Sequence, residues 1–205
     1  MKHKLSIGLA TLSLMLLLAG CAKEPTEQIN AAKAALDNAK AIEADRYVPE
    51  EYTVVQDSLN SALAVIEQQN SKFALTRNYD KAKKTLEDVV TMADQNHQNA
   101  ITRKDETRTE VQQTLAEVKA ALQESKYLIA EAPKGKEGRA ALAEIQDELS
   151  VVESSMNEVT VLVNNGDYLT AQDKANAGLV KVQSLNDELK GAIAKKSAVS
   201  HKKSS

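Results

Sequence analysis

Apolar or small side chains recur at alternating steps of three and four residues through most of this chain. This spacing places them on one face of an α-helix and is typical of coiled coils and helical bundles. Glycine and proline, which interrupt helices, account for only seven and three of the 205 residues. The pattern therefore predicts an all-α protein in which long helices pack through their apolar faces.

Four segments carry the pattern most clearly, and each predicts one helix. The first of these helices is expected from about Glu50 to Leu75, with Pro49 in its first turn. The four stripes are Val55, Leu59, Ala62, Ile66 and Phe73; Tyr79, Ala82, Leu86, Val89, Ala93 and Ala100; Leu142, Ile145, Leu149, Val152, Met156, Val159 and Val163; and Ala171, Ala175, Gly178, Val182, Leu185, Leu189 and Ala192. Shorter stripes are Ile29, Ala32, Leu36 and Ala39, and Val111, Leu115, Val118 and Leu122.

Short breaks separate these helices. Residues 47–49, Tyr-Val-Pro, are expected to end the first helix, because the residue before proline disfavours the helical conformation. Residues 132–135, Ala-Pro-Lys-Gly, predict a second turn. Residues 164–167 predict a third, in which Gly166 takes the left-handed conformation and Asp167 caps the next helix. Asn78 is expected to cap the helix after it. No comparable break follows, so residues 79–131 are expected to form one helix.

The first half of the chain recurs in the second half. Residues 33–36, Lys-Ala-Ala-Leu, return as residues 119–122, and after a short insertion residues 78–79, Asn-Tyr, align with residues 167–168, Asp-Tyr. This order predicts an elongated antiparallel bundle of two three-helix units, residues 28–105 and 106–195, that share one continuous helix. The architecture is similar to that of spectrin-type repeats. Residues 196–205 are expected to be a disordered basic tail.

The start of the chain has the organisation of a secretory signal. Lys2 and Lys4 precede a mostly apolar run that ends at Leu18, which is too short to span a bilayer. The sequence Leu18-Ala19-Gly20-Cys21 resembles the lipobox of bacterial lipoproteins. The resemblance implies that residues 1–20 are a signal peptide cleaved between Gly20 and Cys21. Cys21 would then carry a diacylglycerol and an N-terminal acyl chain such as palmitate, and residues 21–27 would form the tether.

The resemblance also bears on location. Alanine at position 22 looks like the sorting pattern of outer-membrane lipoproteins, so an outer-membrane lipoprotein facing the periplasm is favoured over an inner-membrane one. Because Cys21 is the sole cysteine, no thiol remains for a disulfide or a cysteine-rich metal site. Loss of Lys2 and Lys4 makes the net charge of −3 more negative, which argues against a general nucleic-acid or anionic-membrane binder.

A second resemblance covers residues 29–95. An alanine-rich helix is followed by a Tyr-x-Pro-x-x-Tyr corner at residues 47–52 and by a Tyr-x-x-Ala turn at residues 79–82. This order resembles a family of small helical envelope lipoproteins that is described only as a domain of unknown function. The resemblance implies a location in the envelope and a helical fold, and it implies no activity.

No pattern beyond Cys21 predicts chemistry. His97 and His201 remain after cleavage, and neither has a second histidine one helical turn away, so no metal site or cofactor is expected. The many carboxylates are expected to lie on solvated helix faces beside lysines. Motifs of phosphate loops, serine hydrolases and zinc proteases do not occur. We therefore expect no catalytic residues and no enzyme activity.

Residues 94–110 form a polar stretch within the predicted long helix. The apolar stripe slips there, because eleven residues separate Ala100 from Val111. This predicts either a solvated joint between bundles or a hinge or partner-docking surface. The candidate residues of that surface are His97, Arg103, Lys104 and Asp105.

These features predict a lipid-anchored cell-envelope protein with a scaffold, spacer or adaptor role. Its expected partners are the membrane, through the acyl chains, and an envelope protein or cell-wall component that the sequence does not name; self-association stays open. The alternative is a ligand-binding or chaperone-like module that holds an apolar client. The seam for that client would be lined by residues such as Leu149, Val152, Met156 and Val159.

Overall fold

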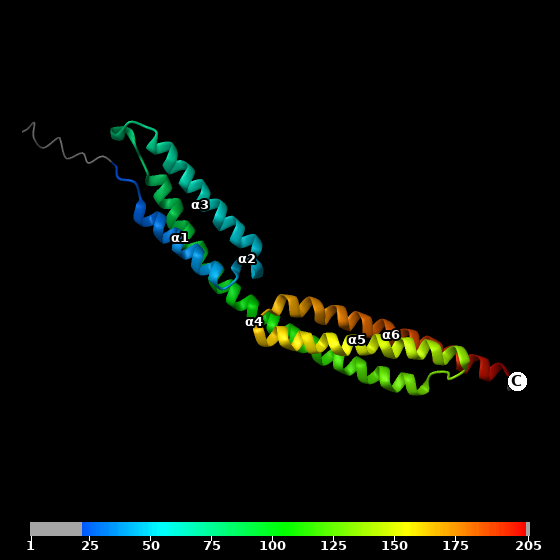
Figure 1. The fold of residues 1–205 in the computed structure, drawn as a ribbon. Coiled ribbons are helices and arrows are strands. Elements are labelled where there is room, and N and C mark those ends of the chain that lie inside the picture. The colour runs from blue at the N-terminus through cyan, green and yellow to red at the C-terminus, as the bar shows by residue number, and fades with distance from the viewer. Residues whose placement is uncertain (1–21, 204–205) are drawn as a thin grey trace, which may run out of the picture. The chain divides into compact units, whose positions relative to one another are not determined.

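A computed structural model describes residues 22–203, and all regular structure in this range is helical (Figure 1). The α-helices are α1 (Thr26–Ala41), α2 (Ala44–Tyr47), α3 (Pro49–Asn70), α4 (Asp80–Glu131), α5 (Lys136–Asn165) and α6 (Tyr168–Lys203), and a 3₁₀ turn, η2, covers Ala74–Thr76. The predicted all-α class is confirmed. The chain divides into two compact units between Thr102 and Arg103, within helix α4.

The first unit, residues 22–102, packs α1, α3 and the beginning of α4 side by side (Figure 1). Asn70 Nδ2 donates a hydrogen bond of 3.0 Å to Glu24 Oε2, so the start of α1 lies beside the end of α3 and the two helices are antiparallel. The interior is made of the predicted stripes. Its buried residues include Ala32, Leu36 and Ala39; Val55, Leu59, Ala62 and Ile66; and Ala82, Leu86, Val89 and Ala93.

The second unit, residues 103–203, packs the rest of α4 against α5 and α6. Burial of each large aliphatic side chain contributes about 1.5–3 kcal/mol, and all three helices supply such side chains. One core cluster contains Val118, Leu128, Ala132, Ile145, Leu149, Val152, Val182, Leu185 and Leu189. A second contains Val111, Val159, Ala171 and Ala175.

The third helices of the two units match at an offset of 89 residues. Positions on α4 that are buried in the first unit have buried counterparts on α6 in the second. The pairs are Ala82 and Ala171, Leu86 and Ala175, Val89 and Gly178, Ala93 and Val182, Asn96 and Leu185, and Ala100 and Leu189. The same positions therefore face the interior in both units.

The first helix ends earlier than predicted. Helix α1 stops at Ala41, and Glu43 takes a left-handed conformation with φ 68°. The backbone N–H groups of Arg46 and Tyr47 donate to the Glu43 carbonyl, which starts the short helix α2 and buries Tyr47. The prediction that residues 47–49 end the first helix is wrong, because a glutamate in this conformation has no sequence signature.

Helix α3 also ends early, at Asn70. The Arg77 guanidinium donates hydrogen bonds to the carbonyls of Asn70 and Lys72, at 2.9 and 3.0 Å, and so satisfies acceptors that the helix end leaves open. The prediction of a helix to Leu75 with Phe73 on its buried stripe is wrong. Phe73 lies in the following loop and is 72% exposed.

The C-terminal end differs from its prediction as well. Helix α6 continues to Lys203, so residues 196–203 are helical where a disordered tail was expected. No glycine or proline follows Gly191, and the alanines and lysines of this stretch are good helix formers. Residues 204–205 lie outside the described range.

Gly166 takes its predicted conformation, with φ 81° and ψ 7°, at the end of α5. Its N–H donates to Val163 O at 3.1 Å. We expect Gly166→Ala to lower the free energy of unfolding by about 1 kcal/mol, because a Cβ disfavours left-handed backbone. Urea unfolding followed by circular dichroism would measure the loss. Gly191→Ala is the control: it lies within α6 with open space around an added Cβ, and should be stabilising. Equal effects in both variants would contradict the assignment.

Candidate functional site

The lipidation candidate and its cleavage site, Gly20 and Cys21, lie outside the described residues, which begin at Ala22. Helix α1 starts at Thr26, only five residues after Cys21 in the sequence. Between residues 22 and 203, no helix combines the length and the hydropathy of a bilayer-spanning segment. The described segment closest to Cys21 in the sequence is residues 22–25.

Residues 22–25 are fixed to one end of the first unit. Pro25 is buried and accepts a hydrogen bond from the Ile29 N–H. The Glu24 carboxylate accepts the hydrogen bond from Asn70 described above. The entry of the chain thus lies beside the loop that follows α3, residues 71–79, which we call the 71–79 loop.

Polar contacts hold the 71–79 loop. The Thr76 hydroxyl and N–H both donate to Phe73 O, at 2.8 and 2.9 Å. Asn78 N–H donates to Gln69 Oε1, and the Tyr79 hydroxyl donates to Asn70 Oδ1. The predicted cap is present, because Asn78 Oδ1 accepts from the backbone N–H of residue 80 at 2.8 Å.

The same loop exposes two large apolar side chains. Phe73 is 72% exposed and Leu75 is 69% exposed. Since the loop is held by hydrogen bonds, neither side chain needs to be buried for the loop to be ordered. Sequence reasoning missed this surface, because the heptad spacing from Ile66 placed Phe73 on a buried helix face.

The four candidate hinge residues all lie on α4 but do not form one cluster. Half-buried His97 faces α1, with Nδ1 3.2 Å from the Asn38 carbonyl oxygen. Arg103 Nη1 pairs with Glu110 at 3.1 Å and Glu106 at 3.3 Å. Asp105 pairs with Arg108 at 2.5 Å, and Lys104 is half-buried. The first candidate therefore holds α4 to α1, and two of the others pair along α4 itself.

The hydrogen bonds that Arg103 donates to Glu110 and Glu106 raise the pKa of Arg103 above its usual value. The Arg103 guanidinium therefore stays positively charged at every pH near neutrality. Because the three side chains are largely exposed, these ion pairs contribute little to stability.

The polar stretch is helical throughout, as the single helix predicted for residues 79–131 requires. Residues 94–110 lie inside α4, and Thr107 is fully buried between Ala100 and Val111 in the stripe. Its hydroxyl donates to Arg103 O at 2.7 Å, which satisfies the buried oxygen. A buried threonine therefore continues the apolar stripe where a slip was predicted. Thr107 is seven residues after Ala100, and this heptad spacing could have predicted its burial.

A buried hydrogen-bond network joins α4 and α6 in the second unit, and no sequence pattern predicted it. Asn186 on α6 donates through Nδ2 to Ala121 O at 3.0 Å and accepts from Ser125 Oγ through Oδ1 at 2.6 Å. Asn186 is the counterpart of His97 at the offset of 89 residues. In both units, this position of the third helix therefore contacts a backbone carbonyl of the first helix of the same unit.

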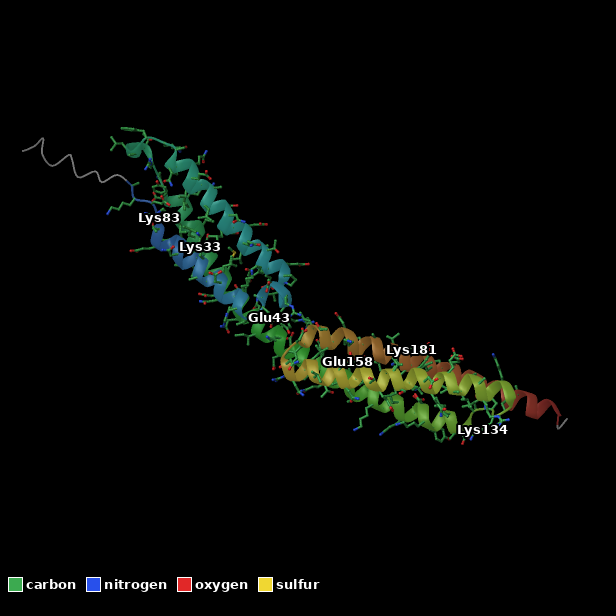
Figure 2. The ribbon with its side chains drawn as sticks, in the orientation of Figure 1. Lys33, Glu43, Lys83, Lys134, Glu158 and Lys181 are labelled. Atoms are coloured by element: carbon green, nitrogen blue, oxygen red, sulfur yellow. The ribbon has the colours of Figure 1, made fainter. Side chains whose placement is uncertain are left out.

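Charged side chains cover the outer helix faces, as Figure 2 shows for Glu158 and Lys181 in the second unit. Lys181 pairs with Glu148, and Lys174 with Glu158, each at 2.7 Å between α5 and α6. The Glu124 carboxylate accepts a hydrogen bond from Lys190 and raises the pKa of this lysine. These carboxylates lie on solvated faces beside lysines, and no group of three or more metal-ligating side chains occurs among the described residues.

Open grooves lie between some of the helices. In the first unit a groove of about 360 Å³ is lined by Glu51, Val54, Val55, Met92, Gln95, Asn96 and Asn99. In the second a groove of about 470 Å³ is lined by Leu115, Lys119, Leu122, Glu153, Met156, Asn157 and Thr160. Of the residues expected to line a client seam, Met156 borders this groove and Leu149 borders a smaller one, whereas Val152 and Val159 are buried.

Comparison of the chain with models of protein families, with curated proteins and with solved structures found no match. The resemblance of residues 29–95 to an envelope lipoprotein family therefore stays a prediction.

Proposed function

We propose that this chain is a lipid-anchored cell-envelope protein with a non-enzymatic scaffold, spacer or adaptor role. The observation that carries the proposal is the sequence Leu18-Ala19-Gly20-Cys21, which follows a basic and apolar leader and stands five residues before α1. One acyl chain gives only marginal membrane binding, whereas several chains give stable attachment. Acylated Cys21 would thus hold the first unit at the outer membrane, facing the periplasm.

The role follows from what the helices leave on their surfaces. The outer faces carry exposed ion pairs, such as Lys181 with Glu148, which cost little to rearrange when a partner binds. Helix α4 belongs to both units, so the chain passes from the anchored unit to the next without a loop. The partner would be an envelope protein or a cell-wall component.

A ligand-binding or chaperone-like role is the second candidate. It is favoured by the groove of about 470 Å³ in the second unit, whose wall includes Leu115, Leu122 and Met156. Lys119 and Glu153 also line this groove, so an apolar client would meet charged groups there. We therefore place this role second.

Fatty-acid labelling tests the anchor. Cells given an alkyne analogue of palmitate should label the wild-type chain, and the Cys21→Ser variant should lose the label completely, because its hydroxyl cannot form the thioether. The matched control replaces residues 1–20 by an ordinary cleavable secretory signal in the Cys21→Ser chain, which should then be released from membranes. An unlabelled wild-type chain would contradict the proposal.

Crosslinking in cells separates the roles. A C-terminally tagged wild-type chain is crosslinked, isolated from the outer-membrane fraction and analysed by mass spectrometry. One dominant envelope protein would identify an adaptor, and self-crosslinks or wall fragments would identify a spacer. A broad set of unfolded clients would favour the chaperone-like role instead.

A further inference from the structure

We propose that the 71–79 loop inserts Phe73 and Leu75 into the interface of the bilayer that holds the acyl chains. The first unit would then contact the membrane at two points, through Cys21 and through this loop. The inference rests on the proposed lipidation of Cys21 and adds a lipid-binding surface to it.

The first step is location. Glu24 accepts a hydrogen bond of 3.0 Å from Asn70, the last residue of α3, and the loop starts at the next residue. Cys21 is three residues before Glu24, so their Cα atoms are at most about 11 Å apart in an extended chain. Acyl chains on Cys21 would therefore bring the bilayer surface to the end of the first unit that carries the loop.

The second step is the state of the two apolar side chains. Phe73 is the single phenylalanine of the chain, yet it is 72% exposed, and Leu75 is 69% exposed. Arg77 and Thr76 fix the backbone around them through hydrogen bonds to carbonyls of the loop and of α3. The apolar pair is thus already held outward, and insertion needs no reordering of the loop.

The third step is charge. Residues 71–79 contain Lys72 and Arg77 and no acidic residue, although the whole chain has a formal net charge of −3. The entry segment adds one exposed cation, Lys23, and one exposed carboxylate, Glu24, so Lys72 and Arg77 remain as the excess positive charge at this end. Lysines at the edge of an apolar contact favour anionic headgroups. An apolar pair with a basic rim matches the interface of a bilayer better than it matches water.

Other exposed apolar side chains do not repeat this arrangement. Among the described residues they lie on α-helices and not in loops. They are Val54, Ile101, Tyr127, Val151, Val161 and Val180. The exposed apolar loop is therefore found at the end of the first unit where the anchor enters.

A single-tryptophan reporter tests the proposal directly, because the chain has no tryptophan of its own. The full acylated Phe73→Trp chain is reconstituted into vesicles of phosphatidylethanolamine and phosphatidylglycerol whose acyl chains carry bromine. Insertion should shift the emission to shorter wavelength and quench it severalfold. The control is Val54→Trp, which is 57% exposed in the same unit but about 24 Å from Asn70 along α3, and which should be neither shifted nor quenched.

The outcomes separate the two proposals. Phe73→Trp emission like that in water, from a chain that sediments with the vesicles, would overturn insertion and leave the anchor standing. A chain that stays in solution would overturn the anchor, and insertion with it. In cells, a photocrosslinker at position 73 that captures a protein and no lipid would also overturn insertion.

A second measurement does not depend on acylation. The unacylated Cys21→Ser chain should bind weakly to vesicles rich in phosphatidylglycerol, and Phe73→Ser with Leu75→Ser should abolish that binding. Both side chains are exposed, so the double variant should keep the helical circular dichroism of its parent. Equal binding of parent and double variant would overturn the proposal.

Discussion

Leu86→Ala should destabilise the first unit by about 2–5 kcal/mol, because removing a buried leucine side chain loses its burial and leaves a cavity. Leu86 is fully buried on α4, among the interior residues of the first unit. We expect the loss to be confined to residues 22–102, since the core clusters of the second unit are built from its own helices. Hydrogen exchange read peptide by peptide would show loss of protection in α1, α3 and the beginning of α4.

The second unit provides the matched variant. Leu189→Ala removes a leucine that is 1% exposed in the core cluster of α4, α5 and α6, and should lower protection there instead. At the offset of 89 residues, Leu86 corresponds to Ala175, and Leu189 corresponds to Ala100. If either variant lowered protection equally in both units, their independence would be disproved.

Leu185→Asn should destabilise the second unit by about 3–5 kcal/mol, because it removes a buried leucine and leaves an amide in its place. Leu185 is 4% exposed and packs in the apolar core cluster of the second unit. Thermal unfolding of the variant should show the loss.

The reciprocal change should act in the opposite direction. Asn96 is the counterpart of Leu185, is 4% exposed, and its Nδ2 has no hydrogen-bond partner among the described residues. Asn96→Leu should therefore stabilise the first unit by about 1–2 kcal/mol, since a buried unsatisfied amide is removed. Lower stability of this variant would show that the amide makes a contact worth keeping, for instance with water in the adjoining groove.

The apolar stripes were sufficient to predict the main helices. The pattern from Leu142 to Val163 predicted α5, and the absence of breaks between residues 79 and 131 predicted α4 almost to the residue. This succeeds because helix packing depends mainly on which face is apolar. The glycine at position 166 likewise predicted the left-handed backbone conformation at the end of α5.

The interior polar residues could not be predicted in this way. Thr107 and Ser125 are fully buried; the Thr107 hydroxyl donates to the Arg103 carbonyl, and the Ser125 hydroxyl donates to Asn186 Oδ1. A hydropathy pattern records such residues as surface. The left-handed Glu43 and the end of α3 at Asn70 depend on hydrogen bonds between residues whose types are common everywhere.

The candidate site was predicted only in part. The resemblance to a lipobox at Leu18 to Cys21 depends only on neighbouring residues, so the sequence is sufficient to recognise it. The lipid anchor itself stays a prediction. The exposed loop was missed because Phe73 fits the heptad spacing of α3. The helix ends before Phe73, at Asn70, where Arg77 donates hydrogen bonds to the carbonyls of Asn70 and Lys72. Exposure of an aromatic residue is a property of the folded loop and has no signature in spacing.

The hydrogen bonds of Asn186 have a consequence for folding accuracy. Three helices whose apolar stripes repeat about every seven residues could slide past one another by two turns and still bury leucine, valine and alanine. Sliding would take the Asn186 amide away from Ala121 O and Ser125, and would leave it buried with nothing to bond. This residue thus penalises the shifted arrangements, and its contribution is to select one register among several that hydrophobicity alone would tolerate.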